Sequence, residues 1–260
     1  MFDVGRTVVG TVLMKDGDEK SEDTRLVAFL KKAQIDYKTS YGKLSLGMIG
    51  MNTHNVQEKN WGYRFIEKSA IDLWGFTSTT DLGIGVSKSI IDNLSMSLQF
   101  TNGEGYKKPQ GDKYHKISFN ATYGEKKLHN NDGYNAGLVY STESTDNDPT
   151  NIISAFAGFS GMGVRIGAEY DMLIKADNYE NNIISISTNY NIKDNIDVYL
   201  RYDMWDDNIT NVKNGKKYLI AGIAFNCNNG LSIAPNMRLT SYEENTKDLN
   251  EYKINFQFIF

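Results

Sequence analysis

The sequence predicts an all-β chain that folds as a transmembrane, antiparallel, up-and-down β-barrel of about 14 strands. Three observations predict it: runs of alternating apolar and polar residues, connections that alternate between short and long, and almost no helical periodicity. The runs are about ten residues long, which is the length of a tilted strand that crosses a bilayer. We expect one barrel domain over residues 1–260.

Composition excludes several other classes. The single Cys (Cys227) allows neither an internal disulfide nor a Cys-based zinc site, and 28 Lys+Arg against 32 Asp+Glu gives no indication of nucleic-acid binding. No apolar run is long enough for a transmembrane helix, and the mean hydropathy is −0.47. A barrel fits these values because its lipid face occupies only every second residue. Residues 1–6 lack a secretory signal, so we expect a removed signal or a truncated gene model.

The final segment shows the alternation most clearly. Tyr252, Ile254 and Phe256 fall on one face of an extended strand, and Lys253 and Asn255 fall on the other. The predicted strands are 5–14, 26–38, 43–53, 78–89, 94–102, 113–123, 134–143, 151–160, 163–173, 182–192, 196–206, 216–226, 231–242 and 250–260.

The connections between these strands alternate in length. The short ones contain Gly or an Asp-Asn pair, which tight turns favour, as in residues 40–42, 91–93 and 193–195. The long ones cover roughly 15–25, 54–77, 103–112, 144–150, 174–181, 207–215 and 243–249, and the connection 124–133 is intermediate. Outer-membrane barrels have short periplasmic turns and long external loops, so the pattern predicts an even number of strands.

A soluble β-sandwich would show the same alternation along each strand. It would not explain why the long connections fall on one side of so many strands. It would also place in its core the tyrosines that here lie near strand ends or on apolar faces, as interfacial residues do. These are Tyr37, Tyr123, Tyr140, Tyr170, Tyr190, Tyr202 and Tyr252.

Residues 54–77 form a connection by position but are not composed like an exposed loop. They contain Trp61, Trp74 and three further aromatic residues, which favour burial. Arg64, Glu67 and Lys68 have helical spacing, so we expect a short helix there. We predict a loop that folds into the barrel and constricts it. The alternative is a loop that covers the rim or contacts a neighbouring subunit.

Four segments resemble the porins related to the phosphate-selective porins (porin O/P) of Gram-negative outer membranes. They are 61–69 (WGYRFIEKS), 77–85 (TSTTDLGIG), 101–105 (TNGEG) and 167–171 (GAEYD). The terminal Phe260 resembles the signature that the barrel-assembly machinery reads. The first of these segments is fairly specific, whereas a terminal Phe marks outer-membrane barrels in general.

The resemblance implies a homotrimeric, water-filled barrel of up to 16 strands, set in outer-membrane lipid and lipopolysaccharide. Its third external loop would fold into the lumen. Residues 54–77 are the second external loop in our count, so we expect one N-terminal hairpin to be missing. The implied function is passive diffusion of ions and small hydrophilic solutes, with anions such as phosphate as candidates.

Departures from that family place phosphate specificity in doubt. Such specificity depends on a ladder of lumen arginines, and this chain has only six Arg. Acidic residues accompany Arg165 and Arg201 on their strand faces, and mixed charge favours weak selectivity. We expect the constriction to consist of Arg64, Glu67 and Lys68. We expect the opposite wall to carry Arg165, Glu169, Asp197, Arg201 and Arg238, with Lys116, Lys38 and Asp81 as weaker candidates.

We expect no cofactor, no metal and no enzymatic activity. The three His are scattered, and no hydrolase, nucleotide-binding or zinc-protease motif occurs. His115 and Ser118 would face opposite sides of their strand. Two alternatives to a channel stay open: a structural or adhesive barrel plugged by its own loop, and a soluble carbohydrate-binding β-protein.

Overall fold

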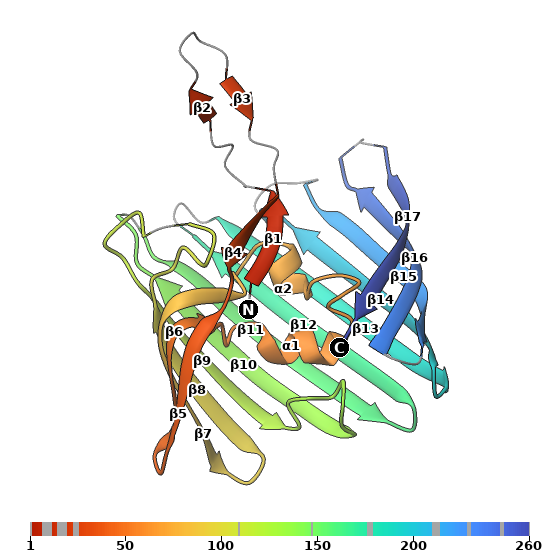
Figure 1. Ribbon diagram of the computed structural model, residues 1–260, viewed down its shortest axis with the longest axis horizontal. Coiled ribbons are helices and arrows are strands. Elements are labelled where there is room, and N and C mark those ends of the chain that lie inside the picture. The colour runs from red at the N-terminus through yellow and green to blue at the C-terminus, as the bar shows by residue number, and fades with distance from the viewer. Residues whose placement is uncertain are drawn as a thin grey trace.

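The chain forms one large antiparallel sheet with two short helices on its concave side (Figure 1). The computed structural model describes residues 2–6, 12–14, 20–22, 26–108, 110–146, 148–175, 179–209, 214–227, 230–244 and 247–259. Thirteen strands form the large sheet, which we call the wall, and each pairs with its neighbours in chain order. The fold is therefore all-β and up-and-down, as predicted.

The wall begins with β5 and ends with β17. Its strands are β5 (Ala33–Thr39), β6 (Gly42–Gly50), β7 (Thr80–Ile91), β8 (Leu94–Thr101), β9 (Lys116–Gly124), β10 (Gly133–Glu143), β11 (Thr150–Gly161), β12 (Val164–Ile174), β13 (Glu180–Lys193), β14 (Ile196–Asp206), β15 (Lys216–Asn226), β16 (Leu231–Tyr242) and β17 (Leu249–Phe258). From residue 43 onward, every predicted strand boundary lies within three residues of the observed one.

Two predicted strands are wrong at the N-terminus. The predicted strand 26–38 is divided into β4 (Leu26–Leu30) and β5, and β4 pairs with β1 (Phe2–Arg6) outside the wall. The predicted strand 5–14 contains the end of β1 and all of β2 (Val12–Met14), which pairs with β3 (Lys20–Glu22); residues 7–11 lie outside the described residues. The wall therefore has thirteen strands rather than an even number, and β5 and β17 are its two edges.

The alternation along each strand separates the two faces of the wall. In β9, Ser118 and Thr122 are buried on the concave side, whereas Ile117 and Phe119 are exposed on the convex side. The other strands repeat this arrangement and cover the convex face with exposed apolar side chains. The prediction of one apolar and one polar face is confirmed. Such an exposed apolar surface requires a non-aqueous environment.

Short and long connections lie at opposite ends of the wall, as predicted (Figure 1). The two-residue turn between β11 and β12 shows why the short ones are tight. Met162 (φ 55°) and Gly163 (φ 77°) are both left-handed, which is the backbone that joins twisted antiparallel strands most closely. We call the two ends the short-turn end and the long-loop end.

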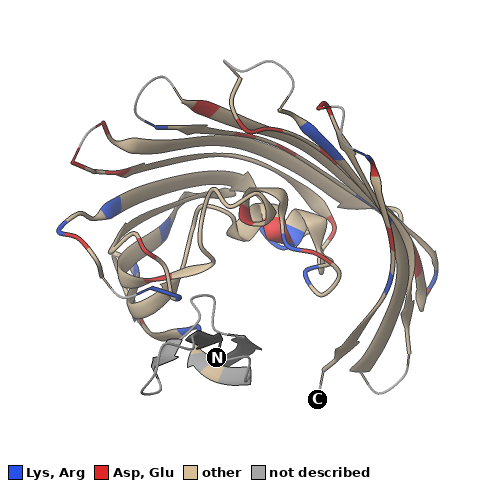
Figure 2. Ribbon diagram, turned by 90° about the horizontal axis from the view of Figure 1, so that it is seen from above, with Lys and Arg blue, Asp and Glu red and all other residues tan. Residues whose placement is uncertain are grey.

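Residues 51–79, which we call the inner segment, connect β6 to β7 and lie against the concave face (Figure 2). They contain α1 (Asn55–Trp61), which packs on β11, β12 and β13, and α2 (Ala70–Leu73), which packs on β13. The predicted helix through Arg64 and Lys68 is wrong, because residues 62–69 connect the two helices. Among the described residues, no helix is long and apolar enough to cross a membrane.

Candidate functional site

Aromatic side chains fix the first half of the inner segment to the wall. Trp61 and Tyr63 are buried against Tyr199 of β14 and Tyr218 of β15. The ring centroids of Tyr63 and Tyr199 lie 5.0 Å apart, and those of Trp61 and Tyr63 lie 5.4 Å apart in an edge-to-face arrangement. Pairs of this kind add about 0.5–1.5 kcal/mol each beyond the area that they bury. The aromatic residues of this connection are therefore its attachment to the wall.

Apolar residues fix the second half. Ile71 of α2 is fully buried with Ile152, Leu173 and Ile183 of β11, β12 and β13. Burial of one such side chain contributes roughly 1.5–3 kcal/mol. At the edge of this cluster, Trp74 and Trp205 are stacked with their ring centroids 4.8 Å apart.

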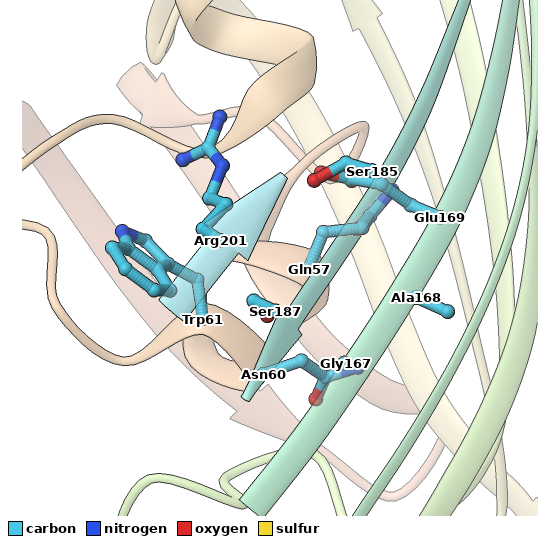
Figure 3. Close-up of a pocket in the computed structure, with 9 residues that line it drawn as sticks. All are labelled: Gln57, Asn60, Trp61, Gly167, Ala168, Glu169, Ser185, Ser187 and Arg201. Carbon is cyan, nitrogen blue, oxygen red and sulfur yellow. The ribbon is translucent and has the colours of Figure 1, made fainter. Parts of the chain in front are cut away.

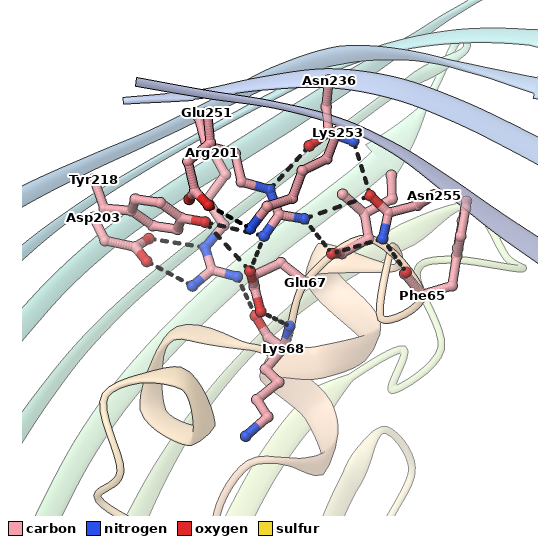
Figure 4. A network of polar contacts seen from close by, with 12 residues as sticks. Phe65, Glu67, Lys68, Arg201, Asp203, Tyr218, Asn236, Glu251, Lys253 and Asn255 are labelled. Carbon is pink, nitrogen blue, oxygen red and sulfur yellow. Dashed lines mark hydrogen bonds and ion pairs between the residues drawn. The ribbon is translucent and has the colours of Figure 1, made fainter. Parts of the chain in front are cut away.

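Polar contacts hold the connection between the helices at the last strands of the wall (Figure 4). Arg238 of β16 forms an ion pair of 2.5 Å with Glu67 and donates a hydrogen bond to the carbonyl oxygen of Ile66. The amide of Asn255 in β17 donates to the carbonyl oxygen of Phe65. The guanidinium and the carboxylate are both largely buried, so removing either partner would leave an uncompensated charge.

Arg201 of β14 forms a second attachment. It pairs with Asp203 at 2.6 Å, and its Nη1 donates to the carbonyl oxygen of Lys68. Asp203 also accepts hydrogen bonds from Ser185 Oγ and from the indole nitrogen of Trp74. Arg201 is fully buried, so it holds the inner segment in place instead of facing open solvent.

The end of α1 is fitted closely to Arg165 of β12. The Arg165 guanidinium donates to the carbonyl oxygen of Trp61 and lies over the ring of Tyr63. Gly62 ends the helix with φ 75°, and a Cβ at this position would lie 2.4 Å from Arg165 Nη2. Glycine is therefore favoured here by the left-handed backbone, and any side chain would also require the Arg165 guanidinium to move.

α1 itself lies directly on the wall over a small polar pocket (Figure 3). Asn60 and Asn135 of β10 exchange hydrogen bonds of 2.9 and 2.8 Å through their side-chain amides. Gln57 donates to Ser154 Oγ of β11. The pocket lies between α1 and strands β12 to β14; its lining residues are Gln57, Asn60, Trp61, Gly167, Ala168, Glu169, Ser185, Ser187 and Arg201.

Contacts within the inner segment join its two helices. Arg64 pairs with Glu58 of α1 at 2.9 Å and with Asp72 of α2 at 2.5 Å, and Lys68 lies 3.8 Å from Asp72. Burial acts to lower the pKa of Arg64, but the carboxylates of Glu58 and Asp72 outweigh it and raise that pKa. The predicted constriction residues Arg64 and Lys68 are thus paired inside the segment, and Glu67 is paired with the wall.

The remaining predicted wall residues lie on the concave side. Glu169 accepts a hydrogen bond from the backbone nitrogen of Ala70, and Lys116 pairs with Glu143 at 2.7 Å. Asp197, near the short-turn end, accepts hydrogen bonds from Asn191 and Asn226. We expected Arg165, Glu169, Arg201 and Arg238 across the passage from the inner segment. The structure places them in direct contact with it instead, and their role in a pore stays a prediction.

The other half of the concave side is open. A cavity of about 760 Å³ lies between the inner segment and strands β5 to β9. Seven basic residues line it, and Glu58 is the single acidic residue among its described lining. We call it the lysine cavity; its basic residues are Lys31, Lys32, Lys43, Lys59, Arg64, Lys126 and Lys127.

Six of these seven residues, all except Arg64, are not predicted from the sequence. Lys31–Lys32 and Lys126–Lys127 are adjacent pairs in connections, where lysine is usually only a solvated residue. The sequence does show that both lysine pairs lie beside strands whose polar faces carry few acidic residues. That observation predicts a basic cavity only once the fold is known to bring the two pairs together.

The lysines of the cavity affect one another. Burial lowers the pKa of Lys59, and the nearby charges of Lys127 and Lys126 lower it further. Burial also lowers the pKa of Lys126, and Lys43 adds to this shift. Lys59, Lys126 and Lys127 are thus close enough to repel one another.

No group of three or more His, Cys, Asp or Glu in the described ranges could hold a metal ion. His115 stacks on the outward-facing Phe100 at a centroid distance of 4.9 Å, whereas Ser118 is buried on the concave side.

Comparison with known protein families and with characterised proteins found no match. Solved structures of outer-membrane proteins are similar to this chain. The OmpF of Salmonella typhi, in complex with daunomycin, has a TM-score of 0.66 and 13% identity over 94% of this chain and 81% of its own. A loop L8 deletion mutant of OmpT, an outer-membrane protein of Vibrio cholerae, has a TM-score of 0.66 and 12% identity over 90% of this chain and 80% of its own.

A structure described as a porin has a TM-score of 0.57 and 12% identity over 86% of this chain and 80% of its own. This chain therefore has the fold of bacterial outer-membrane barrels. Identity this low shows the fold alone.

Proposed function

We propose that this chain is an outer-membrane porin whose passage runs through the lysine cavity, between the inner segment and strands β5 to β9. The observation that carries the proposal is the asymmetric position of the inner segment. From α1 to Phe76 it is fixed to β11–β17 by aromatic, apolar and ionic contacts, and at its start Asn52 hydrogen-bonds to Gln99 of β8 and Asn120 of β9. A cavity of about 760 Å³ remains between it and strands β5 to β9. A cavity of this size accommodates ions and small hydrophilic solutes.

The proposed solutes are small anions. Seven basic residues line the cavity against one acidic residue. Arg64 pairs with Glu58 and Asp72, and Lys43 pairs with Asp36, so the excess of positive charge is carried chiefly by lysines such as Lys59, Lys126 and Lys127. Arg201 and Arg238 are neutralised by Asp203 and Glu67 on the opposite half, so they add little to the field in the passage. A charged lining in a narrow passage with low-dielectric walls concentrates ions of the opposite sign. Phosphate belongs to this class of solute, but we do not propose a dedicated phosphate-binding site.

The convex face supports a location in the bacterial outer membrane. Apolar side chains such as Phe119, Ile166 and Leu200 are exposed there and would contact lipid. The short turns would then face the periplasm, and the long connections the outside. A homotrimer is proposed because similar structures include one described as the trimer form of OmpT. Contact of Phe260 with the assembly machinery stays a prediction, because Phe260 lies outside the described residues.

We propose a passive channel, in which solutes diffuse without a catalytic step. The measurement that tests it is single-channel conductance of the refolded protein in a planar bilayer, under a gradient of potassium chloride. We expect discrete steps and a reversal potential of the sign that chloride preference produces. Insertion without conductance would mean that the inner segment plugs the barrel, and a reversal potential of the opposite sign would contradict the anion preference.

A further inference from the structure

One connection at the short-turn end differs from its neighbours. Residues 125–132, which we call the basic turn, join β9 to β10. Gly124, just before them, donates its backbone N–H to the carbonyl oxygen of Asn93 in the turn between β7 and β8. Connections of two residues at this same end are 40–41, 92–93, 162–163 and 194–195. The basic turn is therefore far longer than the joining of two antiparallel strands requires.

A buried leucine anchors the basic turn inside the barrel. Leu128 is 1% exposed, although Lys127 and His129 on either side of it are exposed. A Cβ at Gly158 of β11 would lie 2.7 Å from Leu128 Cδ1 and 2.7 Å from Asn60 Nδ2 of α1. Leu128 thus packs on the wall beside the helix of the inner segment. Because removing its apolar surface from water is favourable, this contact draws the turn inwards.

Hydrogen bonds join the basic turn to the same helix. The buried side chain of Asn135 in β10 exchanges hydrogen bonds with Asn60, and its Nδ2 also donates to the carbonyl oxygen of Glu125 at 2.6 Å. Within the turn, the backbone nitrogen of Lys127 donates to Glu125 Oε1 at 2.8 Å. One amide side chain therefore connects the wall, α1 and the basic turn.

This anchoring places two lysines at the lysine cavity. Lys126 and Lys127 precede Leu128 in the chain and belong to the lining of that cavity. Glu125 and Asp132, the acidic residues of the basic turn, stand at its two ends and are not part of the described lining. The contribution of the basic turn to the cavity lining is therefore positive.

The other lysine pair of the cavity lies at the opposite end of the wall. The carbonyl oxygen of Lys31 accepts a hydrogen bond from Thr80 Oγ1 at the start of β7, which lies at the long-loop end. The pairs 31–32 and 126–127 thus approach the cavity from its two ends. Positive charge at both ends of a narrow passage concentrates anions at each of them.

We propose that the basic turn is a second constriction element, which enters the barrel from the short-turn end and sets the anion preference there through Lys126 and Lys127. Leu128 is its positioning residue, because its burial holds the two lysines at the cavity. This inference rests on the proposed function, since it concerns the same passage. It adds a specificity-determining element that is separate from the inner segment in sequence and lies at the other side of α1.

The first experiment displaces the two lysines and keeps their charge. Leu128→Ser removes the anchor and leaves Lys126 and Lys127 in the chain. In a bilayer under a gradient of potassium chloride, we expect at least about a twofold fall in the ratio of chloride to potassium permeability. Met162→Ser is the matched control, because Met162 is an apolar turn residue at the same end that is 88% exposed. Heat-modifiable gel mobility identifies the folded variants.

The second experiment removes the charge and keeps the anchor. Lys126→Gln with Lys127→Gln should lower the permeability ratio at least as much as Leu128→Ser does. Lys88→Gln with Lys193→Gln makes the same change in net charge at exposed positions towards the short-turn end, outside the described lining of the cavity. This control should leave the ratio unchanged.

The place of the basic turn is measured without current. In a Cys227→Ser background, Leu128→Cys should resist a maleimide–polyethylene glycol reagent in the folded protein. Asn130→Cys should react, because Asn130 is exposed in the same turn. Labelling of both cysteines at equal rates in folded protein would overturn the proposal, since the turn would then lie outside the barrel.

The conductance experiments separate this inference from the proposed function. A parent chain that prefers anions, with the same preference in Leu128→Ser and in the Lys126–Lys127 double variant, would overturn the inference alone. Equal shifts in the variants and in their controls would also overturn it. A parent chain that inserts without conducting would contradict the proposed function, whereas protection of Leu128→Cys would still place the basic turn inside the barrel.

Discussion

The two halves of the barrel interior differ in what their charges do. On the half formed by β11–β17, two of the arginines that contact the inner segment are paired with carboxylates, Arg201 with Asp203 and Arg238 with Glu67. On the half formed by β5–β9, basic residues line a cavity with a single acidic residue among its described lining. The first half uses charge to position a segment, and we propose that the second uses it to set an electrostatic field in the passage. Charged residues on the inner face of a barrel therefore do not share one role.

The largest effect is expected from the attachment on the first half. Arg238→Met removes the partner of the largely buried Glu67, and breaking such a pair costs about 3–5 kcal/mol. We expect a lower free energy of unfolding in urea and noisier single-channel current. Arg238→Met with Glu67→Gln is the matched control, because it removes both charges and should restore part of the stability. If the single variant were as stable as the parent chain, the ion pair would not hold the segment.

The field on the second half is the next target. One charge about 8 Å from an ion changes the energy of that ion by about 2 kcal/mol at an effective dielectric constant near 20, before screening by salt. Lys59→Glu with Lys127→Glu should therefore shift the reversal potential towards cation preference. Lys193→Glu with Lys247→Glu makes the same change in net charge at exposed positions outside the cavity. Equal shifts in both double variants would place the field outside the lysine cavity.

Two glycines of the inner segment allow the cost of a left-handed backbone to be measured separately from the cost of a side-chain clash with the wall. Gly62 and Gly75 have nearly equal φ values of 75° and 78°, but a Cβ would collide with Arg165 only at Gly62. Gly75→Ala should cost about 1–2 kcal/mol from the left-handed backbone alone. Gly62→Ala should cost more, because Arg165 must also move. Urea unfolding compares the two variants, and equal losses would show that Arg165 can relax freely.

The smallest effect is expected from pH. His54 is 4% exposed, its Nδ1 has no hydrogen-bond partner, and burial lowers its pKa even though Glu58 and Asp72 act in the opposite sense. The unfolded chain therefore binds the His54 proton more tightly than the folded chain does. Stability from this group is fully present above about pH 6.5 and is lost as the pH falls through the lowered pKa.

His54→Gln should flatten the fall in unfolding free energy between pH 7 and pH 5, which urea titrations at the two pH values measure. His115→Gln is the control, because His115 packs on the outward-facing Phe100. An identical pH dependence in the parent chain and in His54→Gln would exclude His54 as its source.

Much of the wall could be predicted because the residues of each strand alternate between apolar side chains for the convex face and polar side chains for the concave face. In β9, alternate residues such as Ser118 and Phe119 specify opposite faces without reference to any other strand. The break at Lys31–Lys32 could not be predicted, because it depends on contacts between distant segments, including the hydrogen bond from Thr80. The helices of the inner segment were misplaced for a related reason: Gly62 ends α1 against Arg165, a residue about one hundred positions away.

The candidate site was harder to predict than the wall. Alternation placed Arg201 and Arg238 on the inner face, but it could not indicate that the inner segment covers them. The lysines that line the open half lie mostly in connections, where the sequence gives no face at all. A residue's role in a lumen depends on what lies opposite, and that is a property of the whole fold.

The central claim is that ions pass through the lysine cavity, and chemical modification of single cysteines inside the barrel tests it most directly. Ser97 of β8 lines the lysine cavity, whereas Ser187 of β13 lies under α1. Ser97→Cys and Ser187→Cys, each in a Cys227→Ser background, are treated in the bilayer with a negatively charged methanethiosulfonate reagent. The account predicts that current through Ser97→Cys falls and that current through Ser187→Cys is unchanged. Block at Ser187→Cys without block at Ser97→Cys would show that the passage lies on the half that we assign to the inner segment.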